Sequence, residues 1–290
     1  MPARAYALAV LPSSFASVGG LPTEGSSDEM TSLREYLDFA MDTAWHAGQL
    51  TLAFFQTGVQ VQWKADESPV TEADQGAEQL IRKLIDRRFP GHAVMGEEYG
   101  ETDTDSTYRW IIDPIDGTRS FIQGVPLYGV LMGLEIDKEP VVGVAYFPAL
   151  REMVSAARGE GCRWNGRVAR VSQVTRLEDA LVSHTDVADL ETDRTREFWN
   201  RIKAATRLQR GWGDCYGHCL VATGRAEIQI DPIMNSWDCA ALAPILEEAG
   251  GTFTDWEGNS TIHGADAFST NGHLFAAVRA LLEETIVSST

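Results

Sequence analysis

The sequence predicts a protein of the α/β class, and three observations carry this prediction. The 290 residues give room for one large α/β domain or two modest ones. Apolar residues recur at helical spacing in residues 30–55 and 81–89, and short apolar or alternating runs elsewhere are typical of strands. A third run, at residues 110–112, leads directly into acids, a glycine and a threonine. That order is typical of a buried strand followed by the start of a helix.

The composition excludes several classes of protein. The formal net charge of -18 argues against a general nucleic-acid binder, because a phosphate backbone requires a basic surface. No apolar run is long enough to cross a bilayer, so we expect no membrane partner. The four cysteines match no zinc-binding spacing. We therefore expect reduced thiols that act as small apolar residues in a cytoplasmic protein.

Residues 1–27 are predicted to form a flexible N-terminal extension. They are rich in alanine, serine and glycine and contain one arginine and a short apolar patch at residues 6–11. No clear cleavage pattern follows the patch, which is unlike a signal or transit peptide, and an organellar targeting segment is the alternative. We expect the rest of the chain to form two halves, residues 28–175 and 176–290.

The first half is predicted to begin with two helices. Ser26, with Glu29 three residues later, is a capping box that opens a helix running to about Phe55. Residues 59–64 alternate like a strand. A second helix then follows Thr71, and Asp74 lies at the position of its capping-box partner.

Strands are predicted to dominate the remainder of the first half. A short strand at residues 93–95 runs into two acids, and an antiparallel or mixed meander begins near residue 128. Asn165-Gly166 is a strong hairpin turn within this meander. The predicted meander strands are residues 128–136, 141–147, 153–157 and 168–171.

The second half is predicted to alternate strands and helices. A glycine-punctuated loop at residues 211–218 leads into one of the helices. Another helix runs through residues 236–249, and Gly250-Gly251 ends it. The further elements are strands at residues 180–183, 226–230, 252–256 and near 268, a helix at 195–205, and a terminal helix.

Asp113 and Asp116 are the candidate centre of the chemistry. They lie three positions apart at one strand end, where two carboxylates repel each other unless a cation lies between them. Gly117 and Thr118 follow at a helix start, where unpaired backbone N–H groups bind anions. The stretch therefore favours divalent-metal and phosphate chemistry, and a turn whose acids cap a helix is the alternative. Glu97 joins this cluster if the two acidic strands are neighbours.

Four motifs together resemble the inositol monophosphatase family of metal-dependent phosphatases. The resemblance runs from about residue 30 to the C-terminus, and it implies a layered α-β-α-β-α sandwich of the inositol monophosphatase and fructose-1,6-bisphosphatase type. It also implies a homodimer. The motifs are Thr71-Glu72-Ala73-Asp74, Gly96-Glu97-Glu98, Asp113-Pro114-Ile115-Asp116-Gly117-Thr118 and Trp237-Asp238-Cys239-Ala240-Ala241.

The resemblance implies a role for each matching residue. Two or three Mg²⁺ ions, with Mn²⁺ as a substitute, would suit ligands that offer only oxygen. The implied metal ligands are Glu97, Asp113, the backbone carbonyl of Ile115, Asp116 and Asp238. Glu97 and Thr118, with Thr118 hydrogen-bonded to Asp74, would orient and deprotonate the attacking water. Lys64 matches a family lysine near the metal site, and the backbone of Gly117 and Thr118 would bind the phosphate.

The second half is expected to select the substrate. Its loop at residues 210–217 departs from the glycine-threonine-alanine pattern of inositol monophosphatases and resembles the histidinol-phosphate phosphatase branch. Arg210, Asp214 and Asp231 are the substrate-binding candidates, and Asp231 matches an acid that contacts the alcohol in inositol phosphatases. L-Histidinol carries an ammonium and an imidazole, which carboxylates would favour over a neutral alcohol. A helix N-cap is the alternative role for Asp214.

Three further acids of the second half are Asp186, Asp189 and Glu191, and solvated loop positions are the preferred interpretation for them. The expected activity is hydrolysis of the small-molecule ester L-histidinol phosphate to L-histidinol and phosphate, a step of histidine biosynthesis. An inositol 1-phosphate or broader sugar-phosphate phosphatase of the same family is the first alternative. A metal-binding regulatory protein without catalysis is the second, and the presence of every expected acid argues against it.

Overall fold

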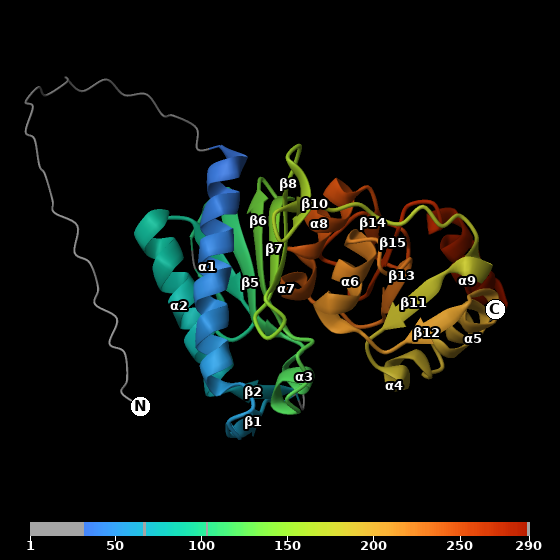
Figure 1. The fold of residues 1–290 in the computed structure, drawn as a ribbon, viewed down its shortest axis with the longest axis horizontal. Coiled ribbons are helices and arrows are strands. Elements are labelled where there is room, and N and C mark those ends of the chain that lie inside the picture. The colour runs from blue at the N-terminus through green and yellow to red at the C-terminus, as the bar shows by residue number, and fades with distance from the viewer. Residues whose placement is uncertain (1–31, 66–67, 103, 289–290) are drawn as a thin grey trace, which may run out of the picture. The chain divides into compact units, whose positions relative to one another are not determined.

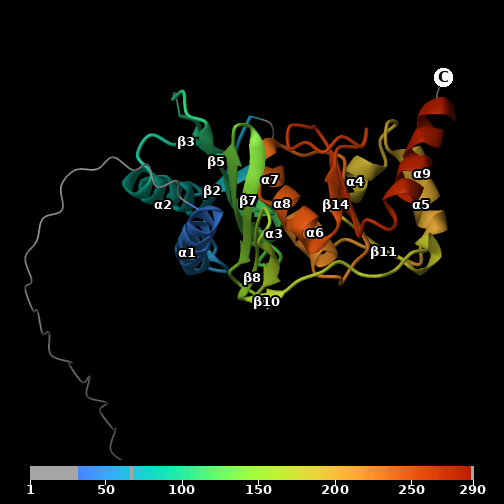
Figure 2. The same cartoon turned by 90° about the horizontal axis from the view of Figure 1, so that it is seen from above.

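A computed structural model describes residues 32–65, 68–102 and 104–288. Its helices and two main sheets alternate in five layers, as Figures 1 and 2 show. Helices α1 and α2 form one outer layer, an eight-stranded sheet the second, and α6, α7 and α8 the third. A five-stranded sheet is the fourth layer, and α5 and α9 pack on its far side. The expected α-β-α-β-α sandwich is confirmed.

The first helical layer consists of α1 (Leu33–Phe54) and α2 (Glu72–Arg88). Helix α1 begins later than predicted, because Ser32 is its N-cap and the Ser32 hydroxyl accepts the N–H of Glu35 at 3.3 Å. Ser26 and Glu29 lie outside the described residues. The predicted capping box at α2 is confirmed: the N–H of Thr71 donates to Asp74 at 2.8 Å.

The eight-stranded sheet has the order β10-β9-β8-β7-β6-β5-β3-β4. Strand β3 is parallel to β5, and every other pairing in the sheet is antiparallel. The parallel pair matters for the chemistry, because the carboxyl ends of β3 and β5 meet at one edge. The strands are β3 (Ala93–Gly96), β4 (Gly100–Glu101), β5 (Tyr108–Asp116), β6 (Gly129–Ile136), β7 (Glu139–Phe147), β8 (Glu152–Ala157), β9 (Gly161–Trp164) and β10 (Arg167–Val168).

The predicted meander is confirmed, with two differences. Strand β9 was not predicted, and β10 is shorter than the expected run at residues 168–171. Asn165 and Gly166 form the hairpin turn between these strands, and both have positive φ, at 48° and 78°. A separate small sheet pairs β1 (Val61–Trp63) with β2 (Pro69–Thr71).

The five-stranded sheet has the order β12-β11-β13-β15-β14. Strand β11 is parallel to both of its neighbours, whereas β15 is antiparallel to β13 and β14. Strand β12 and the short helix α4 were not predicted. The elements are β11 (Leu181–His184), β12 (Leu208–Arg210), β13 (Ile228–Asp231), β14 (Thr252–Thr254), β15 (Ala267–Thr270), α4 (Val187–Leu190), α5 (Arg196–Ala205) and α9 (Phe275–Ser288).

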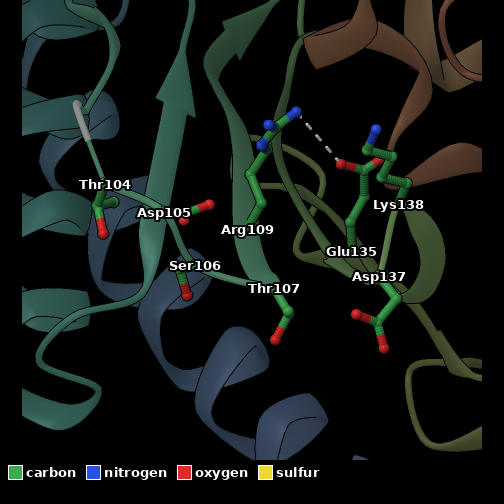
Figure 3. A pocket seen from close by; sticks show the side chains of 8 residues that line it. All are labelled: Thr104, Asp105, Ser106, Thr107, Arg109, Glu135, Asp137 and Lys138. Carbon is green, nitrogen blue, oxygen red and sulfur yellow. Dashed lines mark ion pairs between the residues drawn. The ribbon is translucent and has the colours of Figure 1, made fainter.

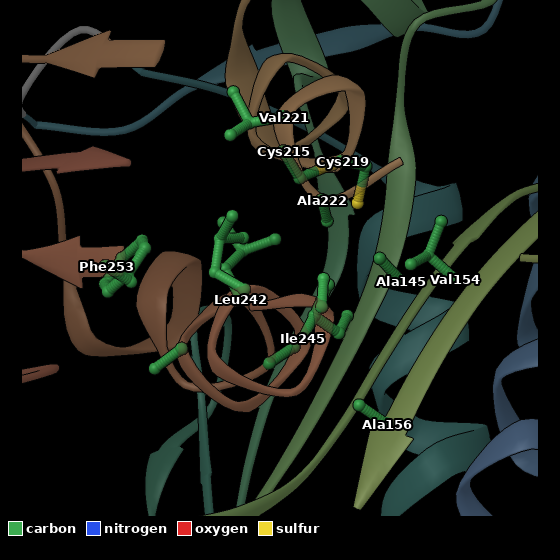
Figure 4. Packing of buried hydrophobic residues seen from close by; sticks show 14 of the residues in the cluster. Ala145, Val154, Ala156, Cys215, Cys219, Val221, Ala222, Leu242, Ile245 and Phe253 are labelled. Atoms are coloured by element: carbon green, nitrogen blue, oxygen red, sulfur yellow. The ribbon is translucent and has the colours of Figure 1, made fainter. Parts of the chain in front are cut away.

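The central helices α6 (Asp214–Ala222), α7 (Ser236–Cys239) and α8 (Leu242–Ala249) pack between the two sheets. Figure 4 shows apolar side chains of α6 and α8 between β7 and β8 on one side and β14 on the other. One helix was predicted over residues 236–249, but the structure divides it at Ala240-Ala241.

Two glycines of the eight-stranded sheet allow the backbone between α7 and α8 to lie against the strands. A Cβ on Gly133 of β6 would be 2.7 Å from the carbonyl carbon of Ala240. A Cβ on Gly143 of β7 would overlap the carbonyl oxygen of Ala241. The backbone that follows Asp238 therefore rests directly on the sheet.

Among the described residues, no helix combines the length and the apolar character needed to cross a bilayer.

Candidate active site

Three carboxylates from distant parts of the chain meet at the end of β5. Asp113, Asp116 and Asp238 each offer an oxygen, and these oxygens lie within 4.8 Å of one another. Strand β5 supplies the first two, and α7 carries Asp238 to them. Two of the acids are fixed by backbone donors: the N–H of Ile115 donates to Asp113 at 2.9 Å, and that of Asn235 donates to Asp238 at 2.7 Å. The group could hold a metal ion.

Glu97 follows the end of the parallel strand β3, which pairs with β5 as the prediction for this residue required. Its Oε1 accepts a hydrogen bond from Lys64 at 2.8 Å, and Lys64 also donates to Glu98 at 2.8 Å. The negative charge of Glu97 contributes to raising the pKa values of Asp113 and Asp238. Lys64 therefore fixes the glutamate beside the three-carboxylate group.

Thr118 and Asp74 are brought together, although they are far apart in sequence. The Thr118 hydroxyl lies 3.3 Å from Asp74 Oδ1 and 2.9 Å from the carbonyl oxygen of Ile115. The other oxygen of Asp74 accepts from the backbone N–H and the hydroxyl of Thr71, at 2.8 and 2.6 Å. Asp74 is thus both the capping-box partner of Thr71 at the start of α2 and the partner of Thr118.

Gly117 is the turn between these acids and the short helix α3 (Thr118–Ile122). Its φ of 83° is in the left-handed region that favours glycine. A Cβ there would also be 3.0 Å from Asp214 Oδ2 and 3.2 Å from the carbonyl oxygen of Leu127. Gly117 is the N-cap residue of α3 and has no side chain with which to cap the helix.

Asp214 lies beside this turn, but not as the N-cap of α6. Gly213 is the N-cap, and Asp214 is the first residue of the helix, with a φ of 52°. The N-cap role is therefore wrong for Asp214. The close approach of Thr185 explains the glycine, because a Cβ on Gly213 would overlap the Cα of Thr185. The Thr185 hydroxyl accepts the N–H of Asp214 at 2.8 Å.

Asp214 and Asp231 line one cavity of about 100 Å³ together with Asp116 and Asp238. Two acids expected to be solvated line it as well: Asp186, which is exposed and caps α4, and the half-buried Asp189. The remaining lining residues are Thr185, Cys215, Pro232, Ile233, Met234 and Leu242. Six of the lining residues are aspartates and none is basic, so the cavity is strongly acidic.

Arg210 and Glu191 do not line this cavity. Arg210 is exposed at the end of β12, and its guanidinium donates to the carbonyl oxygen of Gln209 at 2.7 Å. A larger cavity of about 320 Å³ lies beside the β6–β7 turn (Figure 3). There, Arg109 pairs with Glu135 at 3.7 Å, and Lys138 lies beside Asp137, so the charges are mixed.

Burial is the main cause of unusual carboxyl pKa values at the site. It raises the pKa of Asp238 to about 7, and repulsion from Glu97 adds to this. Burial raises the pKa of Asp214 to about 7 as well, with repulsion from Asp231 and Asp238. The pKa values of Asp113 and Asp116 are raised by burial and by the neighbouring acids. Without a cation, these groups favour protonation at neutral pH.

At Lys64, hydrogen bonds and neighbouring charges outweigh the effect of burial on the pKa. Burial by itself lowers the pKa of this lysine, but hydrogen bonds to Glu97 and Glu98 and their charges outweigh burial and raise it. Burial raises the pKa of Glu98 to about 7 and that of Asp74 to about 6. Asp74 is therefore suited to accept a proton near neutral pH.

These shifts predict that the metal-free protein loses stability as pH rises. A carboxyl with a raised pKa binds its proton more tightly in the folded state than in the unfolded state. Its contribution is fully present below the unfolded pKa of about 4 and is lost as pH rises through the folded value, about 7 for Asp214 and Asp238. Thermal unfolding in EDTA should show a Tm that falls between pH 5 and pH 8.

Adding millimolar Mg²⁺ at pH 8 should restore the Tm, because a cation offsets the repulsion among the acids. Sodium chloride at matched ionic strength is the control for the overall negative charge of the protein. A metal-free Tm that rises steadily over the same pH range would contradict the assigned cause.

Several residues that contact the acids of the site were not predicted from the sequence. The N–H of Cys215 donates to Asp116 Oδ2 at 2.6 Å and so joins the start of α6 to the acid group. Thr185 and Gln229 both donate to Asp231. His218 also contacts Asp231, and its place four residues after Asp214 on one helix face is a sequence signal that could have identified it.

Comparison with known proteins places the chain in a family. The model of the inositol monophosphatase family matches residues 32–289. The histidinol-phosphatase of Chlorobaculum parvum is 46% identical over 83% of this chain and 96% of its own length. The histidinol-phosphatase of Mycobacterium tuberculosis is 37% identical over 82% of this chain and 94% of its own length.

A solved structure agrees with the sequence matches. The extragenic suppressor protein SuhB of Bartonella henselae superposes with a TM-score of 0.81 at 28% identity, covering 86% of this chain and 98% of that one. The family match includes all of the acids described above. The chain is a phosphatase and belongs to the inositol monophosphatase family.

Proposed function

We propose that this phosphatase hydrolyses L-histidinol phosphate to L-histidinol and phosphate. The single observation that carries the proposal is the charge of the small cavity, which six aspartates line without a basic residue. A divalent ion would compensate the acids of the Asp113, Asp116 and Asp238 group. Asp214, Asp231, Asp186 and Asp189 would remain, and the charge of Arg119 offsets part of the negative charge at Asp214 and Asp189. An alcohol that carries an ammonium and an imidazole would compensate the rest better than a neutral polyol.

The donor set fits a hard divalent cation such as Mg²⁺. All the candidate groups offer oxygen, and burial, followed by repulsion among the neighbouring acids, raises the pKa values of Asp113 and Asp116. Asp113, Asp116 and Asp238 would hold the metal, with Glu97 and the carbonyl of Ile115 as further proposed ligands. When bound, the metal would neutralise phosphate charge and lower the pKa of water.

The chain's own residues would orient the reaction. Asp74 holds the Thr118 hydroxyl, and its pKa of about 6 suits it to receive a proton through that hydroxyl. Lys64 holds Glu97 and Glu98 in place by donating to both. Because the N-cap residue Gly117 has no capping side chain, the backbone N–H groups of Gly117 and Thr118 would bind the phosphate oxygens. We propose these roles from the contacts described above.

Phosphate release from a panel of esters with Mg²⁺ tests the substrate. The panel is L-histidinol phosphate, inositol 1-phosphate, fructose 1,6-bisphosphate and adenosine 3′,5′-bisphosphate. We expect the highest kcat/KM for L-histidinol phosphate. A preference for inositol 1-phosphate would overturn the proposal in favour of a sugar-phosphate phosphatase.

Replacing Asp214 by asparagine should mainly raise KM for L-histidinol phosphate, by about tenfold or more, because a charge-assisted contact is lost. The side chain of Asp214 is held by Ser120, and asparagine can accept the same hydrogen bond. The KM for inositol 1-phosphate should change little. Asp137→Asn, in the β6–β7 turn, is the matched control for loss of one negative charge. Equal effects on both substrates would contradict a role in recognising the cation.

A further inference from the structure

His218 is a fully buried histidine on α6, and the reaction described above does not use it. Its Nε2 lies 3.0 Å from Asp231 Oδ2, and its Nδ1 lies 2.9 Å from the hydroxyl of Ser269 on β15. It is not among the residues that line the acidic cavity, whereas Asp231 is. His218 can therefore affect the cavity only through a neighbour.

Asp231 is held from three sides. Gln229 donates to the same oxygen as His218, at 2.8 Å, and the Thr185 hydroxyl donates to the other oxygen. Thr185 in turn accepts the N–H of Asp214 at 2.8 Å. One continuous set of hydrogen bonds thus runs from Ser269 through His218 and Asp231 to the backbone of Asp214.

The direction of these bonds follows from the chemistry of the groups. An ionised carboxylate can only accept, so the hydrogen of the His218–Asp231 bond belongs to Nε2. When the imidazole is neutral, Nδ1 accepts from the Ser269 hydroxyl, which fixes the ring with Nε2–H toward Asp231. Gly217 allows Gln229 to lie beside this pair, because a Cβ there would overlap the Gln229 amide oxygen.

We propose that His218 is a positioning residue that directs Asp231 toward the cationic alcohol part of the substrate. This inference rests on the proposed function, because it requires an ester whose alcohol is a cation. His218 acts on affinity for that cation and takes no part in the transfer of phosphate, since its partners lie on β13 and β15 and not in the three-carboxylate group. Histidine at this position therefore determines specificity from within the core.

The first test compares His218→Leu with His218→Gln, using L-histidinol phosphate and p-nitrophenyl phosphate with Mg²⁺. Leucine removes the donor to Asp231, so KM for L-histidinol phosphate should rise about tenfold, the value of one charge-assisted hydrogen bond. Its kcat should stay within about twofold, and both constants for p-nitrophenyl phosphate should be unchanged. Glutamine offers an amide N–H in place of Nε2–H and should recover most of the affinity.

Ser269→Ala is a milder variant in case the leucine variant does not fold. It removes the donor that fixes the ring, and we expect KM for L-histidinol phosphate to rise about threefold, less than for His218→Leu. Ser155→Ala, a buried serine of β8, is its matched control. In an Asp231→Asn background, adding His218→Leu should have no further effect on KM, because the histidine acts through the Asp231 carboxylate.

The outcomes separate this inference from the proposed function. If the wild-type enzyme does not prefer L-histidinol phosphate over inositol 1-phosphate, the proposed function and this inference both fail. If the preference exists but His218→Leu leaves KM unchanged, or lowers kcat for both substrates in proportion, only the positioning role is overturned. The same holds if His218→Leu and Asp231→Asn have independent effects on KM.

Discussion

Asp116→Asn is expected to lower kcat/KM for every phosphate ester by about a thousandfold or more. Asparagine keeps the shape of the side chain and an oxygen that accepts the N–H of Cys215, but it removes the negative charge. Losing one ligand charge from a group of three carboxylates costs several kcal/mol of charge stabilisation, and each 1.4 kcal/mol is a factor of ten in rate. Phosphate release at saturating Mg²⁺ measures the effect.

Stability provides the control for this variant. Because Asp116 is repelled by its neighbours in the metal-free protein, Asp116→Asn should raise the metal-free Tm at pH 8 while abolishing turnover. The added Tm from Mg²⁺ should shrink at the same time. An active Asp116→Asn enzyme would show that the proposed metal site is wrong.

Gly143→Ala is expected to lower the free energy of unfolding by about 3 kcal/mol, although it adds only a methyl group. The added Cβ would overlap the carbonyl oxygen of Ala241 and would lie 2.9 Å from Pro244. The backbone between α7 and α8 must then move away from β7, and Asp238 moves with it. Urea unfolding measures the stability loss, and Mg²⁺ titration by calorimetry measures the loss of metal affinity.

Gly76→Ala is the matched control. Gly76 lies in α2, where a Cβ would meet only Leu50 at an ordinary distance of 3.5 Å. Alanine favours a helix interior over glycine by about 0.5–1 kcal/mol, so this variant should be slightly more stable and fully active. If Gly143→Ala unfolds like the wild type and binds Mg²⁺ normally, the close approach of α7 does not position Asp238.

The local part of the site could be predicted from the sequence. Asp113 and Asp116 lie three positions apart on one strand, and the capping pair Thr71 and Asp74 has a fixed spacing, so pattern alone indicated both. The prediction that Glu97 joins the acids required β3 and β5 to be neighbouring strands. Their parallel register confirms that requirement. These features depend on the geometry of single elements or of one strand pair.

Contacts between elements could not be predicted in the same way. Strand β12 has three residues and α4 has four, which is too short for a hydrophobic period to emerge. The acids Asp186 and Asp189 seemed ordinary surface residues because nothing local indicates that α4 borders the cavity. The N-cap role for Asp214 was wrong because Gly213 is the N-cap of α6. Position 213 accepts only glycine, because Thr185, some thirty residues earlier in the sequence, lies too close for a Cβ there.

The contact between Cys215 and Asp116 has a consequence for how such an enzyme changes substrate during evolution. The start of α6 meets Asp116, a proposed metal ligand, through the backbone N–H of Cys215, not through a side chain. Side chains at the start of α6 can therefore be exchanged by mutation while that bond persists, and proline at position 215 is the exception because it lacks the N–H. Substrate preference can diverge here while the hydrolytic chemistry is inherited unchanged.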